Sequence, residues 1–234
     1  AGSIDMMDYI NPEDVASVDD NPDLDLILRP SFNVGYFAMH QDFEPFDNLK
    51  VRKALAHAIN KEALIGAFYA GLAEPAKNPM PPSLWGYNDE IEDYPYDLER
   101  AKELLAEAGY PDGFEFDFYY MPVPRPYFPQ PKMVAQAIQY YFSQIGVTAN
   151  LLSYDWGTYL DKYYADELET FILGWTGDNG DPDNFLYVLL DPTQNNNGYD
   201  SEELHEILLE AQRSVDKEER TELYKRAQEI IHED

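Results

Sequence analysis

The chain has 234 residues and a mass of 27.0 kDa, enough for one large domain or two small ones. Its 45 Asp and Glu residues against 16 Lys and Arg give a formal net charge of −29, which argues against nucleic acid and anionic lipid surfaces as partners. Cysteine is absent, which excludes disulfides, a thiol nucleophile and thiolate metal sites. Aromatic residues make up 15% of the chain, so a folded core is expected despite the charge.

The acidity has two interpretations. One is an ordinary solvated acidic surface, as in many exported proteins. The other is adaptation to high salt, where surplus carboxylates keep a protein hydrated while salt screens their repulsion. Neither interpretation identifies a ligand.

The N-terminal third begins with an acidic, proline-punctuated stretch. Alternating or continuous apolar residues predict strands over residues 24–28 and 33–40. A helix is predicted to begin after Asn48, because Val51, Ala54, Leu55 and Ala58 recur at helical spacing. Asn60 is expected to start a new helix that ends near Gly71.

Residues 75–97 are rich in proline and aromatic side chains, so we expect them to cover the domain surface without regular structure. Asp97 is predicted to cap the next helix, and Gly109 to follow its end.

The central part of the chain alternates strand and helix patterns. The predicted strands are 114–120, 147–153 and 170–174, and the predicted helices between them are 132–145 and 156–165. Such a β-α-β-α-β run indicates parallel strands with right-handed crossovers, and therefore an α/β layered domain. Two further helices, capped by Ser201 and by Asp216 in a capping box with Glu219, close the chain.

Common catalytic and metal-binding motifs are absent. The sequence contains no phosphate-binding glycine loop, no GxSxG and no HExxH, and its four histidines lack ligand spacing. Residues 178–184 (DNGDPDN) do not match the EF-hand pattern, which leaves only a nonstandard calcium site open.

Two segments that directly follow predicted strands carry polar side chains on unusual backbones. In residues 121–127 (MPVPRPY), three prolines stiffen the chain that presents Arg125 and Tyr127. In residues 174–185 (GWTGDNGDPDNF), three glycines permit tight turns around Trp175 and Asp178. Ligands of α/β domains gather at the carboxyl ends of strands, so both segments are candidate binding loops. The alternatives are a rigid surface loop and an Asx-turn linker, respectively.

These segments also carry a family resemblance. The chain resembles the peptide/nickel cluster of solute-binding proteins of ABC importers, and within it the dipeptide-binding members. The resemblance rests on residues 47–55 (DNLKVRKAL), 76–82 (AKNPMPP), 85–89 (WGYND), 125–127 (RPY) and 175–185. It implies a two-lobed periplasmic-binding-protein-like fold of type II, a mixed sheet flanked by helices. Relatives are about twice as long, so residues 1–234 are expected to form a single lobe, the second ligand-binding lobe. The first lobe and a closing C-terminal segment would then lie outside residues 1–234.

The resemblance further implies roles for individual residues. Asp178 would pair with the α-ammonium of a peptide, and Arg125 with its C-terminal carboxylate, to which a guanidinium can bond bidentately. Tyr127 and Trp175 would wall the pocket, and the backbone around Gly174 and Gly177 would bond the peptide group.

The resemblance implies an extracytoplasmic component of an ABC importer, with a short peptide as ligand and a membrane permease as partner. The protein would have no cofactor and would be held at the membrane by a segment outside these residues. Alternatives are a different ligand in the same family (a nickel chelate, haem or a sugar) and a hydrolase that uses Asp178 with Asp181 or Asp183.

Overall fold

A mixed four-stranded sheet forms the centre of the computed structural model, which describes residues 4–234. The strands are β1 (Asn33–Met39), β2 (Glu115–Tyr119), β3 (Thr148–Leu152) and β4 (Thr170–Thr176), in the spatial order β1-β4-β2-β3. Strand β2 is parallel to both β3 and β4, and β1 is antiparallel to β4. The predicted parallel β-α-β-α-β run and the mixed sheet are therefore confirmed.

The helices of the sheet layer follow the predicted capping residues closely. They are α2 (Leu49–Ala58), α3 (Lys61–Phe68), α4 (Leu98–Glu107), α5 (Pro131–Ser143) and α6 (Trp156–Tyr164). The side chains of Asn48, Asn60 and Asp97 each accept a backbone N–H bond at the start of their helix, as predicted. Helix α3 ends at Phe68, a little before Gly71, whose φ is +72°. Residues 75–97 contain no helix or strand, as predicted.

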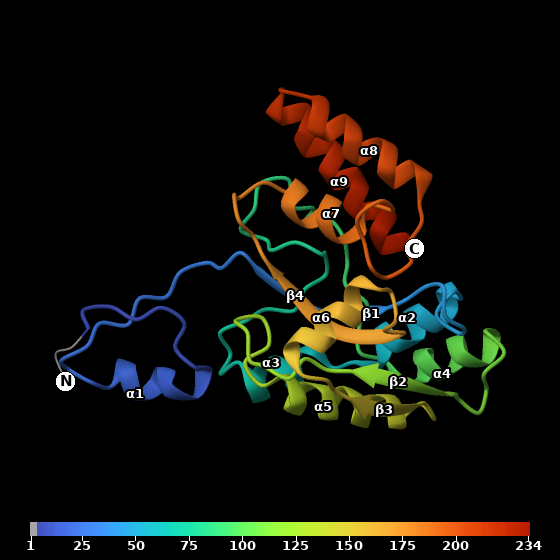
Figure 1. Cartoon of the computed structure of the whole chain (residues 1–234), viewed down its shortest axis with the longest axis horizontal. Coiled ribbons are helices and arrows are strands. Elements are labelled where there is room, and N and C mark those ends of the chain that lie inside the picture. The colour runs from blue at the N-terminus through green and yellow to red at the C-terminus, as the bar shows by residue number, and fades with distance from the viewer. Residues whose placement is uncertain (1–3) are drawn as a thin grey trace.

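Three helices lie on one side of the sheet: α7 (Asp183–Leu190), α8 (Glu202–Arg213) and α9 (Lys217–Glu233) (Figure 1). Ser201 and Asp216 cap α8 and α9. The predicted capping box is only half formed, because the Glu219 carboxylate accepts from the Ser214 hydroxyl instead. Helix α7 was not predicted. It begins inside the 174–185 segment, and its first residues match the turn signals that suggested a loop. Among residues 4–234, no helix is both long enough and apolar enough to cross a bilayer.

The apolar interior is divided into two clusters. The first lies between the sheet and helices α2 to α6 and includes Phe118, Phe142 and Tyr159, which are all fully buried. The second lies under α7, α8 and α9 and includes Phe185 and Tyr224. Tyr36 on β1 packs against both clusters, so β1 joins them. Residues of the 75–97 stretch belong to the second cluster through Met80 and Leu84.

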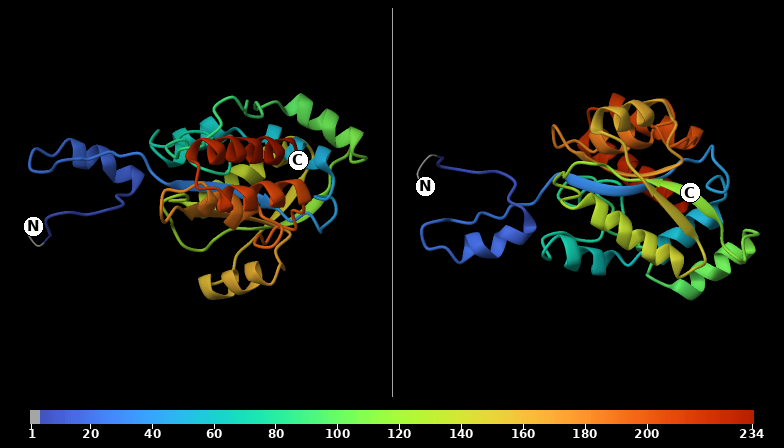
Figure 2. Two further views of the ribbon diagram at one scale, coloured as in Figure 1. Left: turned by 90° about the horizontal axis from the view of Figure 1, so that it is seen from above. Right: turned by 60° about the horizontal axis from the view of Figure 1, so that its bottom comes forward.

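The N-terminal residues extend away from the rest of the molecule as an arm (residues 4–32), which contains a 3₁₀ turn (Pro12–Asp14) and the short helix α1 (Val15–Asp19) (Figures 1 and 2). The prediction of a strand over residues 24–28 is wrong. This segment has no neighbouring strand to pair with, and Leu24, Ile27 and Leu28 are exposed. An apolar run forms a strand only where a partner supplies the other half of the hydrogen bonds.

The surplus of carboxylates predicts an unusual response to salt. We expect the melting temperature of the chain to rise as NaCl is raised from low to molar concentration. At a net charge of −29 the folded state repels itself, and the Debye length shrinks from ~10 Å at 0.1 M to ~3 Å at 1 M. Thermal unfolding followed by circular dichroism measures this shift. A flat or falling melting temperature would show that the acidity is ordinary surface charge.

Candidate functional site

Three segments follow the carboxyl ends of the parallel strands β2, β3 and β4. Arg125 follows β2, Trp156 follows β3, and Asp178 follows β4. Because β2, β3 and β4 run in the same direction, their carboxyl ends point toward the same edge of the sheet. Strand β4 extends further toward that edge, since Tyr119 at the end of β2 pairs with Phe171 and β4 continues to Thr176. The structure therefore brings the two predicted binding segments to the same end of the fold, on the neighbouring strands β2 and β4.

Arg125 is held by its backbone and by an aromatic surface. Its N–H donates to the Phe128 carbonyl and its own carbonyl accepts from the Phe128 N–H, at 3.0 and 2.9 Å, which closes a tight turn. Its guanidinium lies over the ring of Trp156, 4.8 Å from the ring centre, and Trp156 in turn stacks on the buried Tyr159. This stacking restricts the guanidinium but leaves its planar edge available for a carboxylate.

Tyr127 lies in a space made by two glycines. Gly35 on β1 and Gly174 on β4 are direct partners in the sheet. A Cβ atom on Gly174 would lie 2.3 Å from the Tyr127 ring, and one on Gly35 would lie 2.8 Å from the Tyr127 carbonyl oxygen. The same carbonyl accepts a 2.8 Å hydrogen bond from the Tyr69 hydroxyl. The glycine pair thus allows the turn at 125–128 to approach the sheet, and burial raises the pKa of Tyr127.

Trp175 and Asp178 are fixed by a shared partner, Asn184. The Asn184 Oδ1 accepts the Trp175 indole N–H at 3.1 Å and the Asp178 backbone N–H at 2.9 Å. The side chain of Asp178 itself is exposed. Within residues 4–234, no hydrogen bond or ion pair is recorded for its carboxylate. The backbone of Asp178 is therefore fixed while its charge is available to a ligand.

The neighbouring polar groups of this loop are already engaged. Asp181 pairs with Arg220 at 2.9 Å, and Asp183 accepts from the Gln212 amide at 2.9 Å. The N–H of Gly177 donates to the Phe32 carbonyl at 2.7 Å. Asx bonds also occur here, since Asn179 Oδ1 accepts from the Asp181 N–H. The Asx-turn interpretation is thus correct for Asn179 and Asp181, and it does not account for the Asp178 carboxylate.

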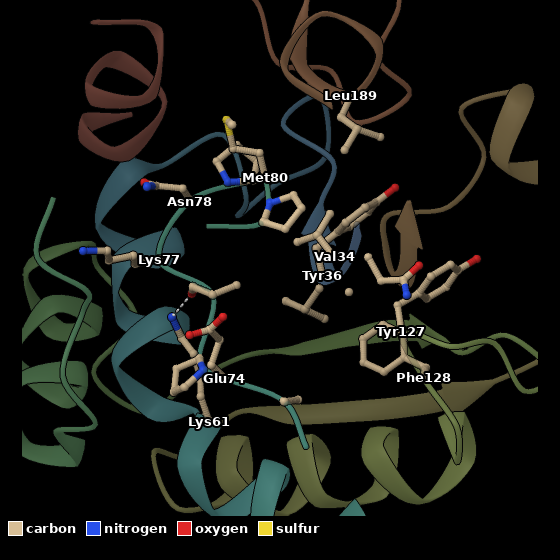
Figure 3. Close-up of a pocket in the computed structure, with 18 of the residues that line it drawn as sticks. Val34, Tyr36, Lys61, Glu74, Lys77, Asn78, Met80, Tyr127, Phe128 and Leu189 are labelled. Carbon is tan, nitrogen blue, oxygen red and sulfur yellow. Dashed lines mark hydrogen bonds between the residues drawn. The ribbon is translucent and has the colours of Figure 1, made fainter. Parts of the chain in front are cut away.

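A large open cavity of about 1400 Å³ lies beside this site, next to β1. Tyr127 and Phe128 lie on one wall, and Lys61, Glu74 and Lys77 on the opposite wall (Figure 3). Of the six predicted site residues, Tyr127 and Gly177 line this cavity, whereas Arg125, Gly174, Trp175 and Asp178 are not among its lining residues. We therefore place the candidate site at the strand ends, where Arg125 and Asp178 lie, and not in this cavity.

Sequence reasoning missed several residues that support the site. Trp156 was assigned only to a helix, although its position directly after β3 was a usable signal. Asn184 lies within the predicted binding segment 174–185, but no role was predicted for it. The contribution of Tyr69, 58 residues from its acceptor, had no sequence signal. Within residues 4–234, no cluster of three or more metal-ligating side chains is found.

Comparison with known proteins connects this geometry with a family. Residues 1–197 match the sequence model of the bacterial extracellular solute-binding proteins, family 5, middle region. The chain belongs to this family. Its four-stranded mixed sheet with flanking helices matches the type II periplasmic-binding-protein fold of family 5 members.

Individual family 5 members are similar over almost the whole chain. A heme-binding protein A of Haemophilus influenzae is 46% identical over 99% of this chain and 43% of its own length. A dipeptide-binding protein of Escherichia coli is 41% identical over 97% of this chain and 44% of its own length. The crystal structure of a dipeptide-binding protein from Pseudoalteromonas sp. SM9913 in complex with Met-Leu superimposes with a TM-score of 0.88 at 33% identity. That match covers 94% of this chain and 45% of the Pseudoalteromonas chain.

The chain therefore spans less than half the length of the family 5 relatives that it matches. These relatives carry the names of binding proteins rather than of enzymes.

Proposed function

We propose that residues 1–234 form the second lobe of the solute-binding component of an ABC importer, and that the ligand is a dipeptide or short oligopeptide bound by its charged termini. One observation carries this proposal. A guanidinium on a stiff turn and a carboxylate that has no partner among residues 4–234, on a fixed backbone, follow neighbouring parallel strands at the same end of the sheet.

A free peptide is a zwitterion, so its site needs one fixed charge of each sign. Asp178 is suited to the α-ammonium because its carboxylate is unpaired among the described residues. Its backbone shares the partner Asn184 with Trp175, whose ring would wall the pocket. Arg125 is suited to the peptide carboxylate because the Trp156 ring orients its donors. Tyr127 would form the opposite wall, and the backbone of Gly174 and Gly177 would complete the peptide-group contacts.

The other half of the binding cleft would come from a first lobe of the same polypeptide. Lobe closure would bury the ligand, and the closed form would be presented to the membrane permease. The whole protein would then act outside the cytoplasm, a proposal that the extracellular description of family 5 supports.

The Asp178 loop supports a hydrolase function less well than it supports peptide binding. A carboxylate mechanism would use Asp178 with Asp181 or Asp183. Asp181 is paired with Arg220 and Asp183 is bonded to Gln212, so neither is poised as a free acid or base beside Asp178.

The proposal predicts that the two-lobed protein binds a dipeptide much more tightly than the single lobe. We expect the two-lobed protein to bind a free dipeptide stoichiometrically and without turnover, and the 234-residue chain alone to bind it more weakly than micromolar. Small-ligand sites normally bury roughly 70–90% of the ligand, which one wall cannot do. Isothermal titration calorimetry on both forms, with product analysis by mass spectrometry, measures this. Micromolar binding by the single lobe, or cleavage of the dipeptide, would contradict the proposal.

A second candidate ligand is haem. It is favoured by the relative named heme-binding protein A, which is 46% identical to this chain. Adding haemin to the two-lobed protein and following the Soret band separates the two ligands. A stoichiometric spectral shift that a dipeptide cannot displace would favour haem over peptide.

A further inference from the structure

The loop that carries Asp178 is anchored to helices far away in the sequence. Residues 177–184 contain Gly177 and Gly180, and Gly180 has a φ of +67°. Such a loop is intrinsically flexible, because glycine restricts the backbone least. In the structure, side chains of α9 and of the proline-rich stretch 75–97 nevertheless form hydrogen bonds to this loop.

Trp85, from the proline-rich stretch, makes the first anchor. Its indole N–H donates to the Gly180 carbonyl at 3.1 Å. Its ring lies edge-on to the buried Tyr224 and beneath the Arg220 guanidinium, 5.0 Å from the ring centre. A single aromatic side chain thus bonds the middle of the loop and packs against α9.

Arg220, near the start of α9, makes the second anchor. Its Nη2 donates to Asp181 Oδ1 and to the Tyr224 hydroxyl, both at 2.9 Å, and its Nε donates to the Ala211 carbonyl of α8 at 2.9 Å. The Arg220 and Asp181 side chains are 21% and 27% exposed, so this pair is better shielded from salt than a surface pair. Burial lowers the pKa of Arg220, but its bonds to Tyr224 and Asp181 outweigh burial and leave the pKa raised.

These contacts act at Gly180 and at the next residue, Asp181, and none of them uses the Asp178 carboxylate. They fix the residues that follow Asp178, while Asn184 fixes its N–H. A ligand that met a disordered loop would have to order it on binding, and that entropy would be subtracted from the affinity.

We propose that Arg220 and Trp85 are positioning residues for Asp178: they clamp residues 177–184 against α9 and so preorganise the carboxylate for a cationic ligand group. The inference deepens the proposed function, on which its ligand rests. Neither residue touches the ligand in this arrangement.

Amide hydrogen exchange on the free two-lobed protein tests the clamp without any ligand. We expect Arg220→Met to raise exchange in the peptide that spans residues 177–184 by about tenfold, since a hydrogen bond to a charged group is lost. Arg226→Met is the matched control, because Arg226 lies on the same helix but pairs with Glu203 and Glu229 on the surface. Asp181→Asn removes the charge of one anchor at nearly constant shape, and Trp85→Phe removes the indole N–H of the other while keeping an aromatic ring. These milder changes separate loss of the clamp from a failure to fold. Unchanged exchange in all three clamp variants would overturn the proposal.

Calorimetry then tests the positioning of Asp178. The clamp variants should bind a free dipeptide about tenfold more weakly and an N-acetylated dipeptide within about twofold of the parent, because only the free ligand has an ammonium for Asp178. Equal losses for both ligands would show that Arg220 and Trp85 support the lobe in general, which would overturn their positioning role. If exchange rises as expected and the parent binds no dipeptide, the clamp stands and the proposed ligand is wrong.

Discussion

Replacing Asp178 by asparagine in the two-lobed protein should weaken the binding of a free dipeptide by roughly 30-fold to several-thousand-fold. The substitution keeps the shape and removes the charge, so the ligand ammonium would be buried in the closed cleft without its partner. Truncating one member of a buried charge pair costs about 2–5 kcal/mol. Calorimetry with one free dipeptide measures the loss.

Asp183→Asn is the matched control for this variant. Asp183 is five residues away on α7, and its carboxylate accepts from Gln212 rather than facing a ligand. Burial raises its pKa, so ionisation of Asp183 opposes folding, and this cost grows as the pH rises from the unfolded to the folded pKa. Asp183→Asn should therefore not destabilise the protein at neutral pH, and its affinity for the dipeptide should change little.

The ligand termini provide a second control for Asp178. An N-acetylated dipeptide should bind the parent poorly and lose little more in Asp178→Asn, because its ammonium is already absent. If Asp178→Asn lost the same affinity for free and N-acetylated dipeptides, Asp178 would act through the shape of the loop. The ammonium assignment would then have to be withdrawn.

Arg125→Met should produce a loss of the same order for a free dipeptide, about 2–5 kcal/mol, with the opposite dependence on the ligand termini. Methionine retains an apolar side chain that can lie on Trp156, so the turn at 125–128 should keep its shape. The loss should be large for a free C-terminal carboxylate and small for a C-amidated dipeptide. Calorimetry with both ligands measures the difference.

Arg226→Met controls for the change in net charge, since Arg226 on α9 pairs only with the exposed side chains of Glu203 and Glu229 among the described residues. An Arg125→Met variant that loses affinity equally for free and amidated ligands would contradict carboxylate recognition by this residue.

The sequence predicted the sheet layer well because its signals are local. Cap residues such as Asn48 and Asp97 form bonds within three residues of themselves, so their helices can be recognised without tertiary information. The strand at 24–28 failed for the opposite reason. Its apolar side chains fit a strand, but pairing depends on a neighbour that the local sequence does not specify. Helix α7 was missed because its start at Asp183 lies within a series of glycine, proline and asparagine turn signals.

For the candidate site, too, the sequence predicted the local features and not the long-range contacts. The position of Arg125 and Asp178 after strands was enough to place both at the carboxyl end of the sheet. The residues that hold Arg125 and the Asp178 loop in place were not predictable, because these residues come from distant parts of the chain. Arg125 lies on Trp156, and the Asp178 loop is bound by Trp85 and Arg220, 95 and 39 residues from their acceptors. No local pattern links such pairs.

The division of the interior into two apolar clusters has a consequence for how ligand length can evolve. The turn that carries Arg125 packs on the first cluster through Tyr127 and Phe128, whereas the Asp178 loop is bound to the second through Trp85 and Tyr224. The spacing between the two charges therefore depends on the contact of Tyr127 with Gly174 and on how one cluster packs against the other around Tyr36. If the ligand is the proposed peptide, substitutions at that internal boundary would change the peptide length that fits between the two charges while leaving both charged side chains unchanged. Selectivity for peptide length, on the proposed function, would then change through substitutions in the core rather than through Arg125 and Asp178.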